Sequence, residues 1–358
     1  MKKIFFTAFL LFVLISQSFA LRNPEEVLPV FQFPADRIPC IDGNPKDWDI
    51  VPESYVICTD RLFEEDSLGT NIDTKNIDIN VRVGWVKRLN RLYILYEAYD
   101  NYWDFAEDSL HNDILELVVD GDLSGGPFIK QFNPNIPKIS IEDLHFTYHG
   151  VHAQNYHIFT PPGDKDWTMV WGCAQWLKDL PYANSAYSYS FRHGENGKLT
   201  LEFYITPFDF ALYDNPRGSV ESELTEGKII GLSWVVLDYD GPGKRNGAYN
   251  LSGKSRMFCD ASDLRAFRLM PLEKSLQKAL EARWSFKIVD MDKRLVAFRD
   301  ESNGEITKWT WDFGDSTFSY DRNPIHAFKT SGEKTVILKI DGPAGKSKFT
   351  RVWNIVLK

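Results

Sequence analysis

Cysteines, long apolar runs and clustered basic residues are all scarce in this sequence. Its four cysteines include no Cys-x-x-Cys pair, which argues against a thiolate zinc site. The spacing fits two disulfides, with Cys40 and Cys58 as the obvious local pair. It also fits four unpaired buried thiols. The apolar run from Ile4 to Ile15 is shorter than the roughly 20 residues that a membrane-spanning helix needs. We therefore predict no insertion into a membrane.

The charge argues against one class of partner. The formal net charge is -9 at pH 7, and no run of Lys and Arg is longer than a pair. Nucleic acid binding requires a concentrated basic face, so we predict no nucleic acid partner. An anionic polysaccharide stays open, because a local cationic groove can form on an acidic protein. Neither a Gly-x-Ser-x-Gly nor a His-Glu-x-x-His motif is present, so no hydrolase motif indicates an enzyme.

The first 20 residues have the pattern of a signal peptide. Lys2 and Lys3 precede the apolar run, and Ser18 and Ala20 place small residues where a signal peptidase cleaves. No cysteine stands at the cleavage point, which argues against a lipid anchor. We therefore expect a secreted or periplasmic protein in which residues 21–35 form an N-terminal extension.

Near the C-terminus, Asp312-Phe313-Gly314 matches the magnesium-binding tripeptide of protein kinases. Kinases place a His-Arg-Asp loop before this tripeptide and a helical lobe after it, and this chain has neither. Trp311 and Phe313 instead alternate with polar residues, as in a β-strand, and a turn sequence follows them. We expect both rings inside a small sandwich, with Asp312 and Asp315 bonded to the backbone of the turn.

Three motifs in this region resemble the PKD domain by their order and spacing: Trp311 to Asp315, Pro324 to Phe328, and Ser331 to Val336. The resemblance covers residues 284–358, with Ser316 and Phe328 as mild departures. It implies a small immunoglobulin-like β-sandwich that acts as a spacer or contacts other proteins. Before it, residues 271–283 have apolar residues at helical spacing after a proline, which predicts a short helical linker.

The region from residue 36 to 270 consists of strand-like segments with turn signals between them. The clearest are Ile77 to Trp85, Leu92 to Tyr99, Ile114 to Val119, Leu199 to Ile205 and Ile229 to Leu237. No helical segment alternates with them, which argues against a doubly wound α/β fold. We therefore predict an all-β protein whose main domain is a large antiparallel β-sandwich.

The order of these elements resembles the carbohydrate-binding family 9-like sandwich, which is related to DOMON domains. The matching pieces are Ile41 to Trp48, Leu92 to Asp100, Asn112 to Asp120, Leu199 to Pro207 and Gly231 to Gly241. A long, loop-rich insert at about residues 128–190 departs from the family, so its sugar-binding residues are not transferred position by position. The resemblance implies a module that holds sugars between aromatic rings, often beside structural calcium.

Aromatic residues gather in this insert and at one strand end. Rings stack on the C–H faces of sugars, while amides and imidazoles bond to hydroxyls, and exposed aromatic clusters indicate binding. We predict a ligand-binding set from the insert and from a second rim near residue 100: Asn155, His157, Trp167, Trp171, Trp176 and Tyr182, then Trp103 and His111. Two other interpretations stay open, namely a second small core beneath the insert and a Trp103 ring that plugs one end of the sandwich.

Four of the 7 histidines lie between residues 145 and 157. A strand would hold His145 and His149 roughly 13 Å apart, too far to share one ion. His149, His152 and His157 could still converge from a loop on a metal or haem. Surface or hydrogen-bonded structural histidines are the other interpretation.

A calcium site is suggested by Asp120, Asp122 and Ser124, which reproduce the first half of a calcium loop. The second half fails, because Gln131 stands where the loop needs Glu. A site completed by distant residues and a simple Asp–Gly turn both fit this pattern.

These patterns together predict a secreted, non-catalytic protein that captures a polysaccharide or oligosaccharide by aromatic stacking. Two alternatives remain. One is a polysaccharide lyase or hydrolase that uses the insert histidines, since its groups would come from scattered positions. The other is a haem-binding protein of the DOMON type.

Overall fold

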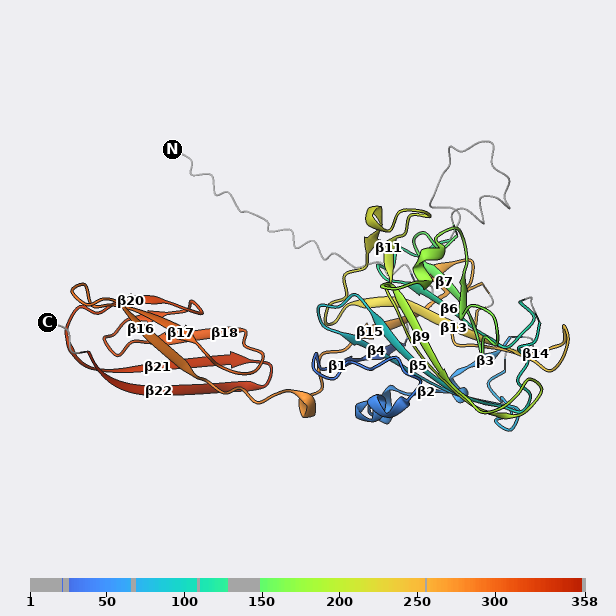
Figure 1. Ribbon diagram of the computed structural model, residues 1–358, viewed down its shortest axis with the longest axis horizontal. Helices are drawn as coiled ribbons and strands as arrows, with labels where there is room; N and C mark the ends of the chain where they lie inside the picture. Colours follow the sequence, from blue (N-terminus) through green and yellow to red (C-terminus); the bar gives the residue numbers. More distant parts are fainter. Residues whose placement is uncertain are drawn as a thin grey trace, which may run out of the picture. The chain divides into compact units, whose positions relative to one another are not determined.

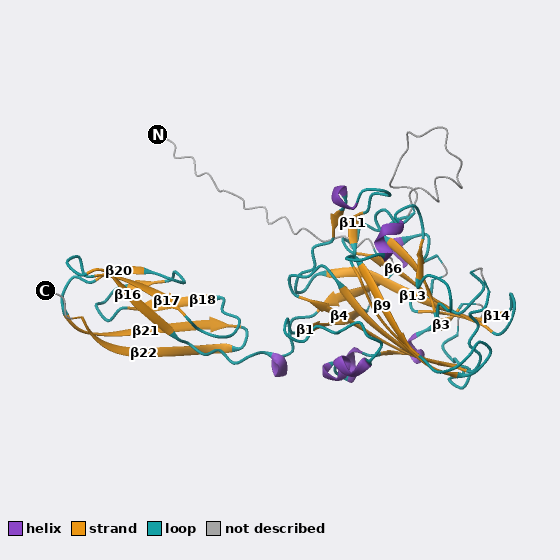
Figure 2. Ribbon diagram, in the orientation of Figure 1, coloured by secondary structure: helices purple, strands orange, loops and turns teal. Residues whose placement is uncertain are grey.

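The computed structural model describes residue 21 and residues 26–65, 69–107, 110–127, 149–254 and 256–355. The predicted signal peptide and residues 128–148 of the predicted insert, with His145, lie outside this part of the chain. The chain divides into two units, Met1–Pro271 and Leu272–Lys358. Strands dominate both units, and the helices of the described residues are short 3-10 turns, none able to cross a membrane (Figure 1, Figure 2).

The larger unit is built on one sheet of 13 strands. Its main path runs β8 (Thr168–Val170), β7 (Gln154–Phe159), β6 (Ile114–Asp120), β13 (Ile229–Tyr239), β15 (Arg265–Leu269), β1 (Val27–Phe33), β4 (Ile77–Val86), β5 (Leu92–Asp100), β10 (Gly197–Ile205) and β9 (Ala183–Ser188). Attached to this path are β2 (Ile57–Cys58), β3 (Phe63–Glu64) and β14 (Arg245–Asn250). A separate pair joins β11 (Phe208–Phe210) to β12 (Val220–Glu221).

The short 3-10 helices connect these strands. They are η1 (Pro45–Ile50), η2 (Glu53–Tyr55), η3 (Thr59–Arg61), η5 (Gln175–Lys178), η6 (Pro216–Gly218), η7 (Ala261–Asp263) and, in the linker, η8 (Lys274–Leu276). The described residues therefore confirm the predicted all-β class.

β1 joins the two halves of the sheet. Its first residues pair in parallel with β15 (Val27 with Ala266), and its last residues pair in parallel with β4 (Phe31 with Gly84). All other strand pairs among the described residues are antiparallel. Side chains from both halves, such as Ile94 on β5 and Leu117 on β6, belong to one buried cluster, so the halves face each other as a sandwich.

The predicted N-terminal extension, residues 21–35, therefore contains a central strand. Val30, Phe31 and Phe33 are at most 1% exposed. A parallel strand that is covered on both faces has a nearly continuous apolar sequence instead of an alternating one. The alternation criterion accordingly did not detect β1.

β6 shows how the sheet positions polar side chains outside the core. Leu115, Leu117 and Val119 point into the sandwich core. Since successive side chains of a strand point to opposite faces, Glu116 points to the outer face. The whole of β6 is buried, because loops of the unit also cover that outer face.

The linker contains one 3-10 turn, η8, where a helix was predicted for residues 271–283. Glu273 before the turn and Gln277 after it have extended ψ angles of 138° and 130°. A helix of about 12 residues is marginal in water unless its apolar face packs on a partner. Leu280 packs on the core of the second unit, whereas Lys278 and Ala279 are exposed.

The second unit is a small sandwich of two sheets. One contains β16 (Trp284–Asp290), β17 (Leu295–Asp300) and β20 (Ile325–Ala327); the other contains β18 (Lys308–Asp312), β19 (Phe318–Ser319), β21 (Gly332–Gly342) and β22 (Gly345–Ile355). Trp311 and Phe313 are buried in its core, as predicted. Asp312 accepts a hydrogen bond from the Gly314 backbone N–H at 3.0 Å, and Asp315 accepts one from Thr317 N–H at 3.2 Å. The tripeptide is therefore part of the turn that connects β18 to β19.

The four cysteines all lie in the described residues and form no disulfide with one another. Cys40 and Cys173 are exposed, and Cys58 and Cys259 are partly buried. The local bridge between Cys40 and Cys58 is therefore not formed. The four thiols are unpaired, as one interpretation expected, but only Cys58 and Cys259 are even partly buried.

Candidate functional site

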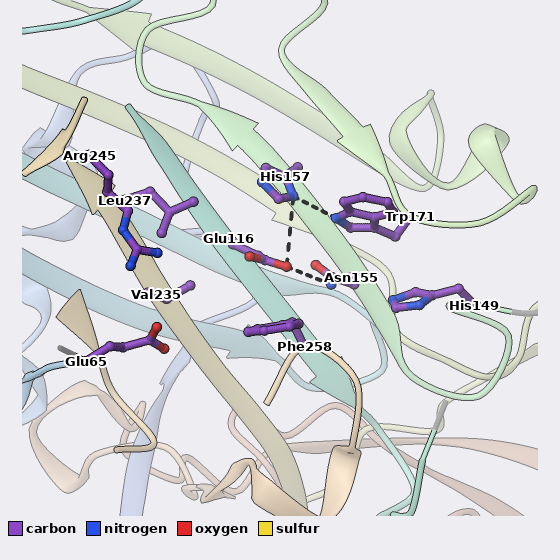
Figure 3. A pocket seen from close by; sticks show the side chains of 10 residues that line it. All are labelled: Glu65, Glu116, His149, Asn155, His157, Trp171, Val235, Leu237, Arg245 and Phe258. Atoms are coloured by element: carbon purple, nitrogen blue, oxygen red, sulfur yellow. Dashed lines mark hydrogen bonds and ion pairs between the residues drawn. The ribbon is translucent and has the colours of Figure 1, made fainter. Parts of the chain in front are cut away.

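A cavity of about 340 Å³ lies on the outer face of β6, β7 and β13. Its walls are formed by those strands, by β14 and by the loops around residues 65, 149, 171 and 258. The lining residues are Glu65, Glu116, His149, Asn155, His157, Trp171, Val235, Leu237, Arg245 and Phe258. Figure 3 shows Glu116, Asn155, His157 and Phe258 between Trp171 and His149 on one side and Arg245 and Glu65 on the other.

Strand register places the polar floor of this cavity. Glu116 on β6 lies directly opposite His157 on β7 and opposite Val235 on β13. Asn155 is two residues before His157, so both side chains point to the same outer face. The Trp171 backbone N–H then donates to the Asn155 carbonyl at 3.0 Å and fixes the loop that follows β8.

Hydrogen bonds connect the floor side chains (Figure 3). Asn155 Nδ2 donates to Glu116 Oε1 at 2.9 Å, and Trp171 Nε1 donates to His157 Nδ1 at 2.7 Å. His157 Nδ1 and Glu116 Oε1 are 3.9 Å apart, too far for a hydrogen bond. Because Nδ1 accepts from the indole, the proton of neutral His157 is on Nε2. Asn155 Oδ1 is buried and accepts no hydrogen bond.

Burial shifts both titratable groups of the floor toward their neutral forms. It raises the pKa of Glu116 to about 7, and the hydrogen bond from Asn155 opposes this rise. Burial lowers the pKa of His157 to about 4. At neutral pH the cavity therefore contains an uncharged imidazole beside a carboxyl group that can hold a proton.

The rim of the cavity is aromatic and charged. Phe258 is 40% exposed, and Trp171 is partly exposed beside His157, with ring centroids 5.6 Å apart. Arg245 is exposed, and Glu65 accepts a hydrogen bond from Asn250 Nδ2 at 2.7 Å. The cavity thus combines apolar ring faces at its mouth with hydrogen-bonding groups at its base.

Three of the eight predicted ligand-binding residues meet in this cavity: Asn155, His157 and Trp171. Trp167, Trp176 and Tyr182 are partly buried and pack against the main core. Trp176 donates to the Leu212 carbonyl at 2.8 Å, and its ring lies edge-on to Phe208 at 5.1 Å. These three rings therefore belong to the margin of the main core, and they do not form the separate small core that the other interpretation expected.

Trp103 and His111 lie apart from the cavity. Trp103 is 1% exposed, stacks on Phe191 with ring centroids 4.9 Å apart, and donates to the Gly197 carbonyl at 3.0 Å. Its ring faces are covered by protein, so Trp103 fills one end of the sandwich and is not a sugar platform. His111 is exposed, with its ring 5.8 Å from that of Tyr239.

The other seven residues that line the cavity were not predicted to bind a ligand: Glu65, Glu116, His149, Val235, Leu237, Arg245 and Phe258. Glu116 had a detectable signal, since an acidic residue between Leu115 and Leu117 must point away from the core. Arg245 and Phe258 come from segments that lie well beyond the end of the insert in sequence. No local pattern connects such distant segments.

The predicted calcium ligands Asp120 and Asp122 lie side by side, and the predicted histidine ligands in the described part of the chain do not form a group. Among the described residues, no histidine belongs to a set of three side chains that could hold an ion. Asp120 Oδ2 accepts from Gly125 N–H at 2.8 Å, and Asp122 Oδ1 accepts from Ser124 N–H at 2.9 Å. These carboxylates organise the turn after β6, as the simple-turn interpretation expects. The group that could hold an ion consists of Asp100, Asp113 and Asp238.

Comparison with known proteins defines the class of the second unit. Residues 293–356 match the family model of the PKD domain, and this part of the chain is a PKD domain. The PKD1 domain of Vibrio anguillarum Epp is 23% identical over 23% of this chain and 99% of its own, with a TM-score of 0.21. The PKD1 domain of the Vibrio cholerae metalloprotease PrtV is 21% identical over 22% of this chain and 96% of its own, with a TM-score of 0.20.

The larger unit is similar to a carbohydrate-binding module. A family 9 module of Caldicellulosiruptor kristjanssonii, solved with cellotriose, is 13% identical over 70% of this chain and 97% of its own, with a TM-score of 0.42. No curated protein matches the chain.

Proposed function

We propose that the larger unit binds a carbohydrate in the cavity beside β6 and β7. The observation that carries this proposal is that a buried polar floor and an aromatic rim line one cavity. A volume of about 340 Å³ suits a small part of a glycan, such as a chain end. The resemblance of the strand order to family 9-like sandwiches agrees with this choice of ligand.

The floor contains groups that can bond to sugar hydroxyls. Glu116 and the Asn155 Oδ1 atom would accept hydrogen bonds from hydroxyl groups, and His157 Nε2 would donate one. Asn155 is 1% exposed and held by Glu116, so this acceptor is already positioned. A fixed site avoids part of the ordering cost that binding otherwise incurs.

The rim supplies apolar contact. Phe258 and Trp171 present ring faces at the mouth of the cavity, where pyranose C–H groups can stack. Arg245 and Glu65 lie on the far side and can bond to hydroxyls, or to a carboxylate in the case of Arg245 (Figure 3). The same position would give the site affinity for acidic sugars.

The test is a panel of oligosaccharides and polysaccharides titrated into the purified chain, with two variants of matched exposure. Phe258→Ala removes a rim residue that is 40% exposed, and Tyr189→Ala removes a ring of equal exposure outside the cavity. We expect Phe258→Ala to weaken binding about tenfold, equivalent to about 1.4 kcal/mol, while Tyr189→Ala leaves it unchanged. Equal effects of both variants, or no binding by the parent chain to any glycan, would refute the proposal.

A hydrolase is the second candidate, favoured by one specific observation. Glu65 and Glu116 line the same cavity, and glycoside hydrolysis uses a pair of carboxyl groups. Burial raises the pKa of Glu116 to about 7, which suits a general acid. Release of reducing ends from a bound polysaccharide that is lost in Glu116→Gln would establish this activity. Retention without product supports the non-catalytic binding proposal.

The rest of the chain fits an exported binding protein. We propose that the signal peptide directs export and that the PKD domain is a spacer or contacts another protein. Phe318, Tyr320 and Ile325 of that domain are between 56% and 69% exposed, which supports a contact role. Deleting residues 272–358 should leave sugar affinity unchanged and reduce co-purification with cell-surface proteins.

A further inference from the structure

The two units differ in the sign of their charge. Met1–Pro271 contains 25 Lys and Arg against 38 Asp and Glu, whereas Leu272–Lys358 contains 16 against 12. The negative net charge of the chain therefore comes from the larger unit, and the unit that contains the PKD domain is basic. A charge asymmetry between two parts of a chain is typical of a protein whose basic part meets an anionic partner.

Lysines gather on the outer face of the sheet that contains β18, β21 and β22. On β21, Leu338 and Ile340 are buried in the core, so Lys339 between them points to the outer face. Strand register places Lys348 of β22 and Thr310 of β18 directly opposite Lys339. Opposite residues of antiparallel strands share a face, so the three side chains form one row across the sheet. Both lysines of this row are exposed.

The neighbouring row of the same face adds two more lysines. Asp341, two residues after Lys339, lies opposite Lys346 on β22 and opposite Lys308 on β18. Lys346 Nζ is 3.5 Å from Asp341 Oδ1, an exposed ion pair. No carboxylate of the described residues forms an ion pair with Lys308, Lys339 or Lys348. Four lysines therefore share one carboxylate on this face.

Lys339 and Lys348 form a pair of like charges that the fold itself does not need. Directly opposite residues of antiparallel strands have Cβ atoms about 4.5–5.5 Å apart, and like charges in this position destabilise the sheet. β22 is an edge strand, where lysines prevent pairing with other chains. That role explains Lys348 but not Lys339, because β21 lies between β18 and β22. An anionic ligand would turn this repulsion into attraction.

The two rows border a hollow of about 370 Å³. Its lining residues are Thr310, Lys339, Ile340, Asp341, Lys346, Ser347 and Lys348. None of these described residues is aromatic, so nucleotide bases would find no ring to stack on. An acidic sugar has carboxylates for the lysines and hydroxyls that can donate to Asp341, whereas the DNA backbone offers Asp341 only negative charge. The mixture of groups in the hollow therefore suits an acidic sugar better than a nucleic acid.

We propose that this lysine face of the PKD domain binds a polysaccharide that carries a carboxylate on each sugar unit. Neighbouring strands are about 4.8 Å apart and alternate residues of one strand about 6.8 Å apart, so the four lysines require closely spaced negative charges. Lysine ammonium groups act as point charges and do not need the bidentate geometry of arginine. The site does not depend on the cavity of the larger unit, so neutral oligosaccharides test the cavity and a charged polymer tests this face.

The test is titration of the full chain with polygalacturonate and with the same polymer after full methyl esterification, which removes its charge. The double variant Lys339→Gln/Lys348→Gln is compared with Lys287→Gln/Lys329→Gln, which loses two exposed lysines outside the hollow. We expect the parent chain to bind the charged polymer and not the ester. Binding should weaken about tenfold in the first double variant and by at most about twofold in the second. Added NaCl should weaken binding, because salt screens exposed charges.

Three outcomes would overturn the proposal: a parent chain that does not bind polygalacturonate, equal weakening in both double variants, or tighter binding of duplex DNA than of polygalacturonate. Thermal unfolding without polymer checks that the variants fold, and loss of the repulsion between Lys339 and Lys348 should leave Tm unchanged or raise it. If that double variant does not fold, Lys308→Gln provides the test, and unchanged affinity would then count against the lysine face. Failure of neutral oligosaccharides to bind would refute only the cavity.

Discussion

Glu116 and His157 face each other across two strands and respond to pH in opposite directions. Between pH 4.5 and 7 the folded chain keeps a proton on Glu116 that the unfolded chain releases, so the contribution of Glu116 to stability declines as pH rises. Between pH 6.5 and 4 the unfolded chain binds a proton that buried His157 does not, so stability declines as pH falls. Over the shared range the two effects partly cancel.

Single substitutions should separate these effects. Glu116→Gln removes the carboxyl group that keeps its proton in the folded chain. Relative to the parent chain, the variant should therefore gain on the order of 2–3 kcal/mol of unfolding free energy as pH rises from 4.5 to 7. His157→Asn keeps an acceptor for Trp171 and should gain relative stability as pH falls from 6.5 to 4. Urea unfolding at stepped pH measures both, and curves parallel to that of the parent would contradict the assignment.

Two tryptophans should differ in what their loss affects. Trp103→Ala empties a fully buried position stacked on Phe191 and should cost about 3–5 kcal/mol of stability. Trp171→Ala removes a partly exposed ring at the cavity and should lower sugar affinity with a smaller cost in stability. Denaturant unfolding and glycan titration of both variants check this contrast, which fails if Trp103→Ala is the milder change in stability.

At the scale of elements, the turn after β18 requires a glycine at residue 314. Gly314 has φ +72°, and a Cβ there would lie 2.5 Å from the Thr335 carbonyl oxygen. Gly314→Ala should therefore destabilise the PKD domain by more than the strain of about 1 kcal/mol that positive φ alone imposes. Gly332→Ala is the control, since Gly332 has φ +103° and open space around it. If both variants lower the melting temperature equally, the close approach of residue 314 to the Thr335 carbonyl does not affect stability.

The elements also show how far sequence patterns reach. Alternation located β4, and apolar runs between turn signals located β5, β6, β10 and β13. These patterns did not locate β1, and they overestimated the linker, because helical spacing does not show whether a partner packs on the helix. Motif chemistry placed the PKD turn correctly, because Asp312 and Asp315 act within a few residues.

The cavity was harder to predict for a physical reason. Asn155, His157 and Trp171 were identified as polar or aromatic residues of a loop-rich segment, and they do meet. The same criterion selected Trp103, Trp167 and Trp176. Their rings, however, pack against Phe191, Phe203 and Phe208. Whether a ring is covered depends on strand order, and local sequence does not contain that order.

At the scale of the whole molecule, the two units have separate cores. One buried cluster includes Trp103 and Trp234, and another includes Trp284 and Trp311. Calorimetry of the full chain should therefore show two transitions, with Trp103→Ala lowering one and Gly314→Ala lowering the other. A single transition that both variants lower would contradict separate folding.

β1 has a consequence for how the larger unit is made. Val27 pairs with Ala266, so the first strand of the unit completes its hydrogen bonds only after β15, the last strand of the unit, has been synthesised. Contacts between such distant residues form slowly, because a long loop must close first. Until β15 has been synthesised, β1 can pair only with β4, so the two halves of the sheet cannot be joined.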